Sequence, residues 1–374
     1  MNSTTSTNPE PGGLRLAVDA MGGDAGPAPV VAGAAQALRD GLNAEMHFFG
    51  PEAQLRPLLD DQQELASAKI FDADSVVSMT DKPMHVLRRG RDTSMWKAIE
   101  HVTNNAAHGL VSCGNTGALM AVARRQLGMI EGIERPAITA IWPTPKGRSV
   151  VLDVGANVEA DEEQLVNFAI MGEAFFRALT GKERPTVGLL NVGSEELKGH
   201  ELIRRAAKTL READPAMAFS GFVEGNDISL GAVDVVVTDG FTGNIALKSA
   251  EGAARLVGGW MKEALTANIL SKLGALLMRR QLGVLKDRID PSSVNGGVFL
   301  GINGVVVKSH GSADSKGVSS AISMAAQLVG KGFRKEVAET VALVKSRRHD
   351  VHEGTETTST PSDRPEPDVP QAAE

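Results

Sequence analysis

One strand–turn–helix segment sets the fold class of this 374-residue chain: Leu14-Arg-Leu-Ala-Val-Asp-Ala-Met-Gly-Gly-Asp24, followed by APVVAGAAQALRDGL over residues 28–42. The apolar run before Asp19 is typical of a buried strand, and Gly22-Gly23 marks a turn. Apolar residues then recur at helical spacing until Gly41, a residue that commonly ends helices. The segment therefore predicts a βα unit with an acidic residue at the carboxyl end of its strand.

The same plan recurs along the chain, at residues 109–127, 149–159, 186–199 and 233–248. Residues 46–50 and 68–74 read as further strands, and residues 296–314 as a hairpin or strand pair before a closing helix at 317–333. Alternating strands and helices predict a three-layer α/β/α, Rossmann-like fold with a mostly parallel sheet. The small polar residues that end the strands are expected at the carboxyl edge of that sheet, where ligands bind.

The domain organisation follows from composition. We expect one α/β domain over residues 14–348, with disordered segments at 1–13 and 349–374. Residues 350–374 hold seven acidic residues and one arginine, which leaves a net charge of about −1 for the rest of a chain whose total is −7. Residues 252–290 have helical patterns with no strand between them, and we expect a helical excursion there.

Composition also excludes several classes of protein. One cysteine, Cys113, allows neither an intrachain disulfide nor a cysteine-based zinc site, and it favours a reducing, cytoplasmic compartment. The first 13 residues lack the basic and apolar regions of a signal peptide, and no apolar run is long enough to span a membrane. A nearly neutral body without aromatic residues among its basic ones does not indicate nucleic-acid binding.

Common cofactor motifs are missing. The sequence contains no P-loop, no dinucleotide Gly-x-Gly-x-x-Gly, no Gly-x-Ser-x-Gly elbow and no histidine pair at metal-ligand spacing. Asp19 and Asp24 share one loop but have no further ligands nearby in sequence, so they are weak candidates for Mg²⁺. We therefore expect neither a metal nor a cofactor.

Two glycine turns suggest an anion site instead. Gly114-Asn-Thr-Gly117 and Gly240-Phe-Thr-Gly243 each precede a helix, 126 residues apart, and could form two half-sites facing one ligand. Backbone N–H groups and the helix dipole favour an anion at such a terminus. Helix capping by the Thr and Asn side chains explains either turn equally well, and the match can also arise by chance.

Basic and titratable residues near these turns are the remaining candidates. Lys308 and His310 straddle the end of a strand, where they could hold phosphate or protonate a leaving group. The alternatives are a solvated lysine and a capping histidine, and Lys198 and Lys248 are equally compatible with surface charges.

Two surface features point to partners. Arg88, Arg89 and Arg91 form a basic run that could dock an acidic partner or lie in a solvated loop. Residues 265–280 carry an apolar stripe beside basic residues; it fits a dimer interface, a core-packing helix or a membrane-contacting surface.

Eight motifs together resemble the bacterial phosphate acyltransferases, the acyl-ACP:phosphate transacylases of phospholipid synthesis. They occur in the family's order over residues 14–335: AVDAMGGD, SCGNTGALMA, ERPAI, LDVGANVE, LLNVGSEELKG, GFVEGNDI, DVVVTDGFTGNIALK and KSHGSAD. The resemblance implies a fold like that of isocitrate and isopropylmalate dehydrogenases and phosphotransacetylase, and a homodimer. It also implies transfer of a long-chain acyl group from acyl carrier protein to inorganic phosphate, with the product passing to a membrane glycerol-3-phosphate acyltransferase. A cytoplasmic protein peripherally associated with the membrane is expected.

The residues and the resemblance together give the expected site. Residues with a catalytic role are Lys308, His310, Asn115 and Asp239. Those that bind substrate or phosphate are Asp19, Gly22, Gly23, Asp24, Ser112, Gly114, Thr116, Gly117, Asn157, Asn191, Lys198, Thr242, Gly243, Asn244 and Lys248. Those facing the carrier protein, a second subunit or the membrane are Arg88, Arg89, Arg91, Leu265, Ile269, Leu273, Leu277, Arg279 and Arg280.

Two other functions stay open at this point. One is a phosphotransacetylase-like enzyme that uses coenzyme A and a short acyl group. The other is a non-catalytic scaffold that keeps the fold and binds lipid through residues 260–285.

Overall fold

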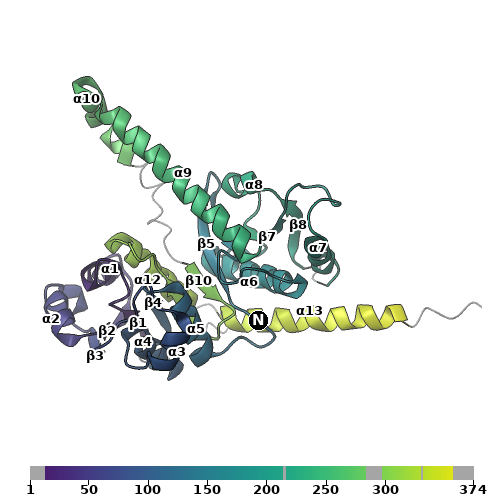
Figure 1. Ribbon diagram of the computed structural model, residues 1–374, viewed down its shortest axis with the longest axis horizontal. Helices are drawn as coiled ribbons and strands as arrows, with labels where there is room; N and C mark the ends of the chain where they lie inside the picture. The colour runs from purple at the N-terminus through teal and green to yellow at the C-terminus, as the bar shows by residue number, and fades with distance from the viewer. Residues whose placement is uncertain (1–12, 214–215, 284–296, 330–331, 357–374) are drawn as a thin grey trace, which may run out of the picture.

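The computed structural model describes residues 13–213, 216–283, 297–329 and 332–356. They form an α/β fold around one sheet of eleven strands, in the order β3-β2-β1-β4-β11-β10-β5-β6-β9-β7-β8 (Figure 1). The strands are β1 (Leu14–Asp19), β2 (Ala44–Gly50), β3 (Lys69–Asp72), β4 (Gly109–Ser112), β5 (Ala137–Thr144), β6 (Gly147–Leu152), β7 (Thr186–Leu190), β8 (Ala218–Val223), β9 (Val235–Val237), β10 (Gly297–Leu300) and β11 (Val305–Lys308).

Helices connect the strands. They are α1 (Pro27–Arg39), α2 (Glu52–Asp60), α3 (Pro83–Arg89), α4 (Ser94–Thr103), α5 (Thr116–Leu127), α6 (Glu162–Thr180), α7 (Glu201–Ala213), α8 (Gly225–Leu230), α9 (Gly240–Thr266), α10 (Ile269–Leu277), α12 (Ser315–Val329) and α13 (Phe333–Glu356), with a 3₁₀ turn at Gln63–Leu65. The helix α13 continues past residue 348, so part of the segment expected to be disordered is helical. Residues 1–12 and 357–374 lie outside the described residues.

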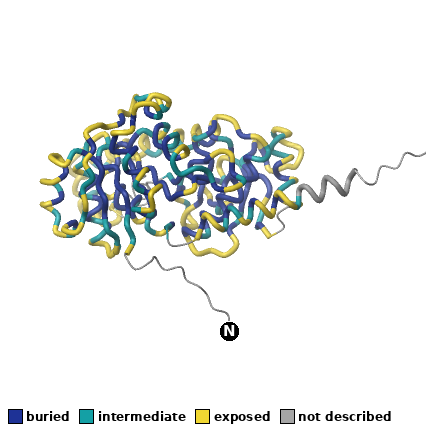
Figure 2. The backbone as a smooth tube through the Cα atoms, turned by 90° about the horizontal axis from the view of Figure 1, so that it is seen from below, coloured by how far each residue is buried: buried dark blue, intermediate teal, exposed yellow. Residues whose placement is uncertain are grey.

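Both faces of the sheet are buried, as the mostly parallel α/β prediction requires. Within β1, Leu16 and Val18 point into one core with residues of α1, α6 and α12, whereas Ala17 points into the other with α4 and α5. This alternation explains why the strand reads as a continuous apolar run. Figure 2 shows buried backbone through the middle of the elongated body and exposed backbone around it.

The sheet contains one reversal that the sequence patterns did not predict. The strands β1, β2, β3, β4 and β11 are parallel to one another, and β6, β7, β8 and β9 form a second parallel set. The strands β10 and β5 join the two sets through antiparallel pairs, β10–β11, β10–β5 and β5–β6. The second set therefore runs opposite to the first. The strand-ending polar residues do not share one carboxyl edge, contrary to the sequence-based expectation.

The predicted hairpin at residues 296–314 is confirmed by the β10–β11 pair. The predicted excursion is also present, as α9 and α10, which project from the body (Figure 1). Residues 284–290 of that prediction lie outside the described residues. Among the described helices, none has the length and apolar character to cross a membrane.

Candidate active site

Asp19 is the centre of a buried polar network at the end of β1. Its carboxylate accepts hydrogen bonds of 2.7 Å from the Ser94 and Ser112 hydroxyls, and the Ser112 hydroxyl accepts one of 3.0 Å from Gly114 N. Burial raises the pKa of the Asp19 carboxyl, and the two hydroxyl donors oppose that shift. The network ties the β1 loop to the turn that begins α5.

The first loop approaches the turn before α5 so closely at Gly22 that only glycine fits there. A Cβ atom at Gly22 would lie 2.4 Å from Gly114 N, closer than a Cβ atom can approach, and 3.0 Å from Asp19 Oδ2. At Gly23 a Cβ atom would meet nothing nearer than 3.4 Å. The backbones of the two loops therefore touch at Gly22. Asp24 joins the first loop to the loop after β11, because its N–H donates to Gly311 O over 2.7 Å.

Asn115 caps α5 and fixes its N-terminus. Its side-chain oxygen accepts from Ala118 N over 3.0 Å, and its Nδ2 donates to carbonyl groups of Ser78, Met79 and Asp81. The N–H groups of Thr116 and Gly117 make no hydrogen bond to any residue that the structure describes. The predicted capping is thus present, and two first-turn donors remain available for an anion.

Lys308 brings a buried cation to the segment that leads from β4 into α5. The strand β11 pairs with β4 so that Lys308 lies opposite Ser112, and its Nζ donates to the carbonyl oxygens of Cys113 (3.3 Å) and Ser309. Only 7% of the residue is exposed, and burial lowers the pKa of its ammonium to about 8. Burial raises the pKa of the Cys113 thiol, which keeps the sulfur protonated and argues against a nucleophilic role.

His310 and Lys248 complete the basic character of this region. His310 is exposed, but partial desolvation lowers the pKa of its imidazole, and the Lys308 ammonium lowers it further. Lys248 and Glu251 of α9 also influence the His310 pKa, in opposite directions, so α9 passes close to this loop. Glu251 accepts from Lys248 Nζ over 3.0 Å and pairs with Arg255.

A second polar network lies at the end of β6, where Asp153 is fully buried. Its carboxylate accepts from the backbone N–H groups of Ile138, Gly155, Ala156 and Asn157, and from Asn157 Nδ2. Burial raises the pKa of this carboxyl, and the hydrogen bonds from Ala156, Ile138 and Asn157 oppose that shift. Asn157, a predicted binding residue, uses its amide for this network and for Pro136 O (2.7 Å).

The start of α9 packs onto this second network. A Cβ atom at Gly243 would lie 1.9 Å from Asp153 O, and Asn244 Nδ2 donates to Val154 O over 3.1 Å. Asp239 caps the helix by accepting from the N–H and hydroxyl of Thr242, each at 2.8 Å. The predicted residues Asp239, Thr242, Gly243 and Asn244 thus have local structural partners. They follow β9, which belongs to the set of strands that runs opposite to β4.

Asn191 and Lys198 occupy a third position, the loop after β7. Asn191 is buried and its Nδ2 donates to Lys198 O over 3.0 Å, while Lys198 is exposed and forms an ion pair of 2.7 Å with Glu195. No interaction links this loop to Lys308 among the residues that the structure describes.

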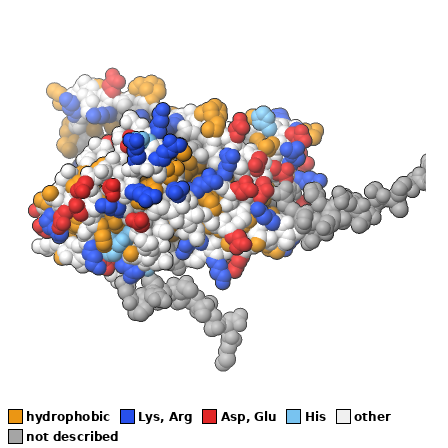
Figure 3. All heavy atoms as spheres, turned by 60° about the horizontal axis from the view of Figure 1, so that its bottom comes forward, with side chains coloured by type: hydrophobic (Ala, Val, Ile, Leu, Met, Phe, Trp, Pro, Cys, Tyr) orange, Lys and Arg blue, Asp and Glu red, His pale blue; other side chains and the backbone are white. Residues whose placement is uncertain are grey.

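The predicted partner-facing residues are at the surface. Arg88, Arg89, Arg91, Arg279 and Arg280 are exposed, as are the apolar side chains Ile269, Leu273 and Leu277, and Leu265 is partly exposed. Packing of the stripe into the core is therefore not observed. On the face shown in Figure 3, Lys and Arg side chains gather around a hollow that is partly lined by hydrophobic side chains.

Sequence reasoning missed two members of the networks, Ser94 and Asp153. Ser94 carries no signal of its own in the sequence, whereas Asp153 has the same signal as Asp19, an acidic residue directly after an apolar strand. No group of three His, Cys, Asp or Glu side chains suited to a metal ion occurs among the described residues.

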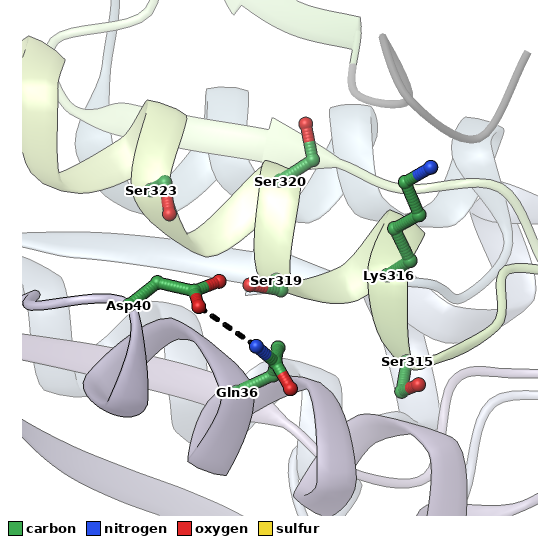
Figure 4. Close-up of a pocket in the computed structure, with 7 residues that line it drawn as sticks. All are labelled: Gln36, Asp40, Ser315, Lys316, Ser319, Ser320 and Ser323. Atoms are coloured by element: carbon green, nitrogen blue, oxygen red, sulfur yellow. Dashed lines mark hydrogen bonds between the residues drawn. The ribbon is translucent and has the colours of Figure 1, made fainter. Parts of the chain in front are cut away.

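A cavity of about 530 Å³ lies between α1 and α12 (Figure 4). Its lining is polar: Gln36, Asp40, Ser315, Lys316, Ser319, Ser320 and Ser323. Gln36 Nε2 donates to Asp40 Oδ1 over 2.8 Å beside Ser319. Hydroxyl and charged groups do not suit an acyl chain, so we do not place a hydrocarbon there.

Comparison with known proteins agrees with this architecture. Residues 14–336 match the family model described as "Fatty acid synthesis protein". A Maricaulis maris protein named phosphate acyltransferase is 52% identical over 326 residues, covering 86% of this chain and 93% of its own length. A phosphate acyltransferase of Rhodobacter capsulatus is 50% identical over 343 residues, covering 90% and 86%.

Solved structures with the same fold include phosphotransacetylases. A phosphotransacetylase from Streptococcus pyogenes superposes with a TM-score of 0.56 at 18% identity, covering 84% of this chain and 94% of its own. A putative 4-hydroxythreonine-4-phosphate dehydrogenase from Salmonella typhimurium gives 0.51 at 15% identity, covering 84% and 99%. At these identities the likeness concerns the fold alone, and it confirms the Rossmann-like class.

The fold and the relatives together define an acyltransferase. The chain belongs to the bacterial phosphate acyltransferase family.

Proposed function

We propose that this enzyme transfers a long-chain fatty acyl group from acyl carrier protein to inorganic phosphate. The acyl phosphate would then feed glycerol-3-phosphate acylation in phospholipid synthesis. The observation that carries the proposal is the buried Lys308 beside the N-terminus of α5, in a chain whose relatives are phosphate acyltransferases.

Phosphate binding follows from the charges and donors of this region. The free N–H groups of Thr116 and Gly117 and the helix dipole favour an anion. The Lys308 ammonium, with a pKa of about 8, is mostly charged at neutral pH and adds a charge-assisted bond. Lys248 supplies a second cation from α9.

The chemical step requires positioning more than a covalent intermediate on the enzyme. A phosphate oxygen attacks the thioester carbonyl carbon, a C–O bond forms, and the C–S bond breaks when the tetrahedral intermediate collapses. The proton of hydrogen phosphate passes to the leaving thiolate, so atoms and charge balance. Lys308 stabilises the developing negative charge, and His310, whose pKa is lowered from its usual value, can relay the proton.

The first test is product formation. We expect the purified protein to form acyl phosphate, trapped as a hydroxamate with hydroxylamine, from palmitoyl–acyl carrier protein and phosphate. Acetyl-CoA with phosphate is the comparison, since it is the donor of the phosphotransacetylase-like alternative. Product from acetyl-CoA alone would refute the proposed donor, and no product from either would refute the enzymatic proposal.

The exposed helices α9 and α10 suggest a second property. Leu273 and Leu277 are 54% and 79% exposed, and we propose that a membrane surface or a second copy of the chain covers them. Leu273→Glu/Leu277→Glu should abolish liposome binding without changing soluble activity if the membrane covers them. Dissociation of a dimer by the same variant would assign them to a subunit interface.

A further inference from the structure

We propose that an acidic acyl carrier protein docks on the surface formed by α3, α5 and the loop before α3, here called the α3–α5 face. It is defined by eight exposed residues: Val76, Met79, Met84, Arg88, Arg89, Arg91, Arg124 and Arg125. This inference rests on the proposed function, because it presupposes a carrier-bound acyl donor.

The two helices of the face carry basic but no acidic side chains; the acidic residues nearest in sequence are Asp81, before α3, and Asp92, after Arg91. The helices α3 and α5 contain four arginines, two in the last turn of each, and no acidic residue. None of the five arginines forms an ion pair within the described ranges 13–213, 216–283, 297–329 and 332–356. Other helices pair their basic residues internally, as in Arg56–Glu52 on α2 and Arg205–Glu201 on α7.

A purely structural explanation accounts for only part of this charge. Arginines in the last turn of a helix stabilise its dipole by about 0.3–1 kcal/mol. That explanation covers Arg88 and Arg89 on α3, and Arg124 and Arg125 on α5, but not Arg91, which follows the helix. It also does not explain the exposed apolar side chains in and beside the loop before α3.

Those apolar side chains give the face the composition of a protein interface. Val76, Met79 and Met84 are 42%, 47% and 59% exposed and lie in or beside the loop that leads into α3. Methionine and arginine are both enriched at interfaces, around a core depleted of acidic residues.

The face is physically joined to the candidate site. Asn115 Nδ2 bonds to the carbonyl groups of Ser78 and Met79 at 3.2 and 3.0 Å, which fixes the loop against the start of α5. Met79 Cε lies 3.0 Å from the position a Cβ atom would take at Gly311, one residue after His310. Met79 of the face therefore borders the loop that follows β11 and carries His310.

The distances suit the flexible arm of a carrier protein. Arg91 is three residues from Ser94 of the Asp19 network, so their Cα atoms are at most about 11 Å apart. Arg125 is nine residues along α5 from Thr116, or about 14 Å. By contrast, the helix from Lys248 to Thr266 alone extends about 27 Å, so Arg279 and Arg280 beyond it are much farther along the chain from the site.

The experiment compares charge reversals of equal size in the full-length chain. Arg88→Glu/Arg89→Glu and Arg124→Glu/Arg125→Glu alter the face, and Arg279→Glu/Arg280→Glu alters the other basic surface. Lys146→Glu/Arg148→Glu, at exposed positions of the β5–β6 hairpin, is the matched control. For each, kcat and the KM values for palmitoyl–acyl carrier protein and phosphate are measured, together with binding of the unacylated carrier protein by fluorescence anisotropy and the Tm.

We expect both face variants to raise the carrier KM and the carrier Kd at least about tenfold, with kcat and the phosphate KM within twofold of wild type. The control should match wild type, and added salt should weaken carrier binding more in wild type than in the face variants. If a reversal prevents folding, the corresponding Arg→Gln variant should still raise the carrier KM several-fold.

An unchanged carrier KM and Kd in folded face variants would overturn the inference while leaving the proposed function standing. An effect confined to the Arg279/Arg280 variant would also overturn it and move docking to that end of the molecule. If the wild-type protein makes acyl phosphate only from acyl-CoA, the proposed donor itself is wrong. This result can be told apart from the two outcomes that concern the docking surface, because it is obtained without any variant.

Discussion

Substituting Gly22 with alanine probes the contact that joins the first loop to the α5 turn. The new Cβ atom would lie 2.4 Å from Gly114 N, 2.8 Å from Gly114 Cα and 3.0 Å from Asp19 Oδ2. Two of these three atoms are backbone, so no side-chain rotation relieves the overlap. One of the two loops must move.

The expected loss of stability follows from two contributions. Overpacking of a tight contact costs about 1–3 kcal/mol, and displacing Asp19 weakens hydrogen bonds to the Ser94 and Ser112 hydroxyls, each worth about 1.5–3 kcal/mol as bonds to a charged group. We expect Gly22→Ala to lower the free energy of unfolding by about 3 kcal/mol and the Tm by about 5 °C.

Gly23→Ala is the matched control one residue away. Its Cβ atom meets only ordinary contacts, 3.4 Å from Gly311 O and 3.7 Å from Cys113 Cβ. Reduced freedom of the unfolded chain should leave this variant equal to wild type or about 0.4–1 kcal/mol more stable. Urea unfolding followed by circular dichroism, with acyl phosphate formation in parallel, measures both. Equal midpoints and equal activities for the two variants would refute the proposed backbone contact.

Three further outcomes can be checked. The Lys308 ammonium has a pKa of about 8 and must be charged to hold phosphate. The kcat/KM for phosphate should therefore fall about tenfold per pH unit above pH 8, and Lys308→Arg should move that fall to higher pH. An identical pH profile for the two proteins would contradict this role of Lys308. His101 lies in the last turn of α4, and its Nε2 is 2.8 Å from Nδ1 of His47. Burial lowers the folded-state pKa of His101 to about 4, below its unfolded value near 6.5. The neutral ring therefore contributes its full stabilisation above pH 6.5, and this contribution is lost as the pH falls toward 4. The loss of stability is below about 3 kcal/mol because the His101 ring is partly solvated. His101→Gln should flatten the plot of the free energy of unfolding in urea against pH between pH 6.5 and 4. An unaltered plot would exclude this contribution of His101. Asp153→Asn replaces a carboxylate oxygen that accepts hydrogen bonds from N–H groups with an amide that donates. This variant should lower the free energy of unfolding by about 3 kcal/mol. An unfolding midpoint equal to that of wild type would show that the Asp153 network is dispensable for stability.

Local patterns in the sequence were enough to predict the βα units. The apolar run of β1, the turn at Gly22-Gly23 and the helix ending before Gly41 are all properties of neighbouring residues. The β10–β11 pair was recognised for the same reason. Helix capping by Asn115 was one of the sequence-based alternatives, and Asn115 is the N-cap of α5. Asp239, named only as a candidate catalytic residue, is the N-cap of α9.

Long-range pairing could not be predicted in the same way. The strand β5 was not recognised, and the β5–β6 hairpin reverses the second half of the sheet, so half-sites at Gly114 and Gly240 begin from strands that run in opposite directions. Lys308 reaches Cys113 across 195 positions only because β11 pairs with β4. The depressed pKa of Lys308 results from that burial, which no single motif contains.

The most direct test of the phosphate site is a phosphate saturation curve for Lys308→Gln, with palmitoyl–acyl carrier protein held at a saturating concentration. Loss of one charge-assisted bond of about 1.5–3 kcal/mol predicts a phosphate KM raised about 10- to 150-fold, with the carrier KM unchanged. A phosphate KM equal to that of wild type, in a variant that folds with the same Tm, would contradict the assignment of Lys308 to the phosphate.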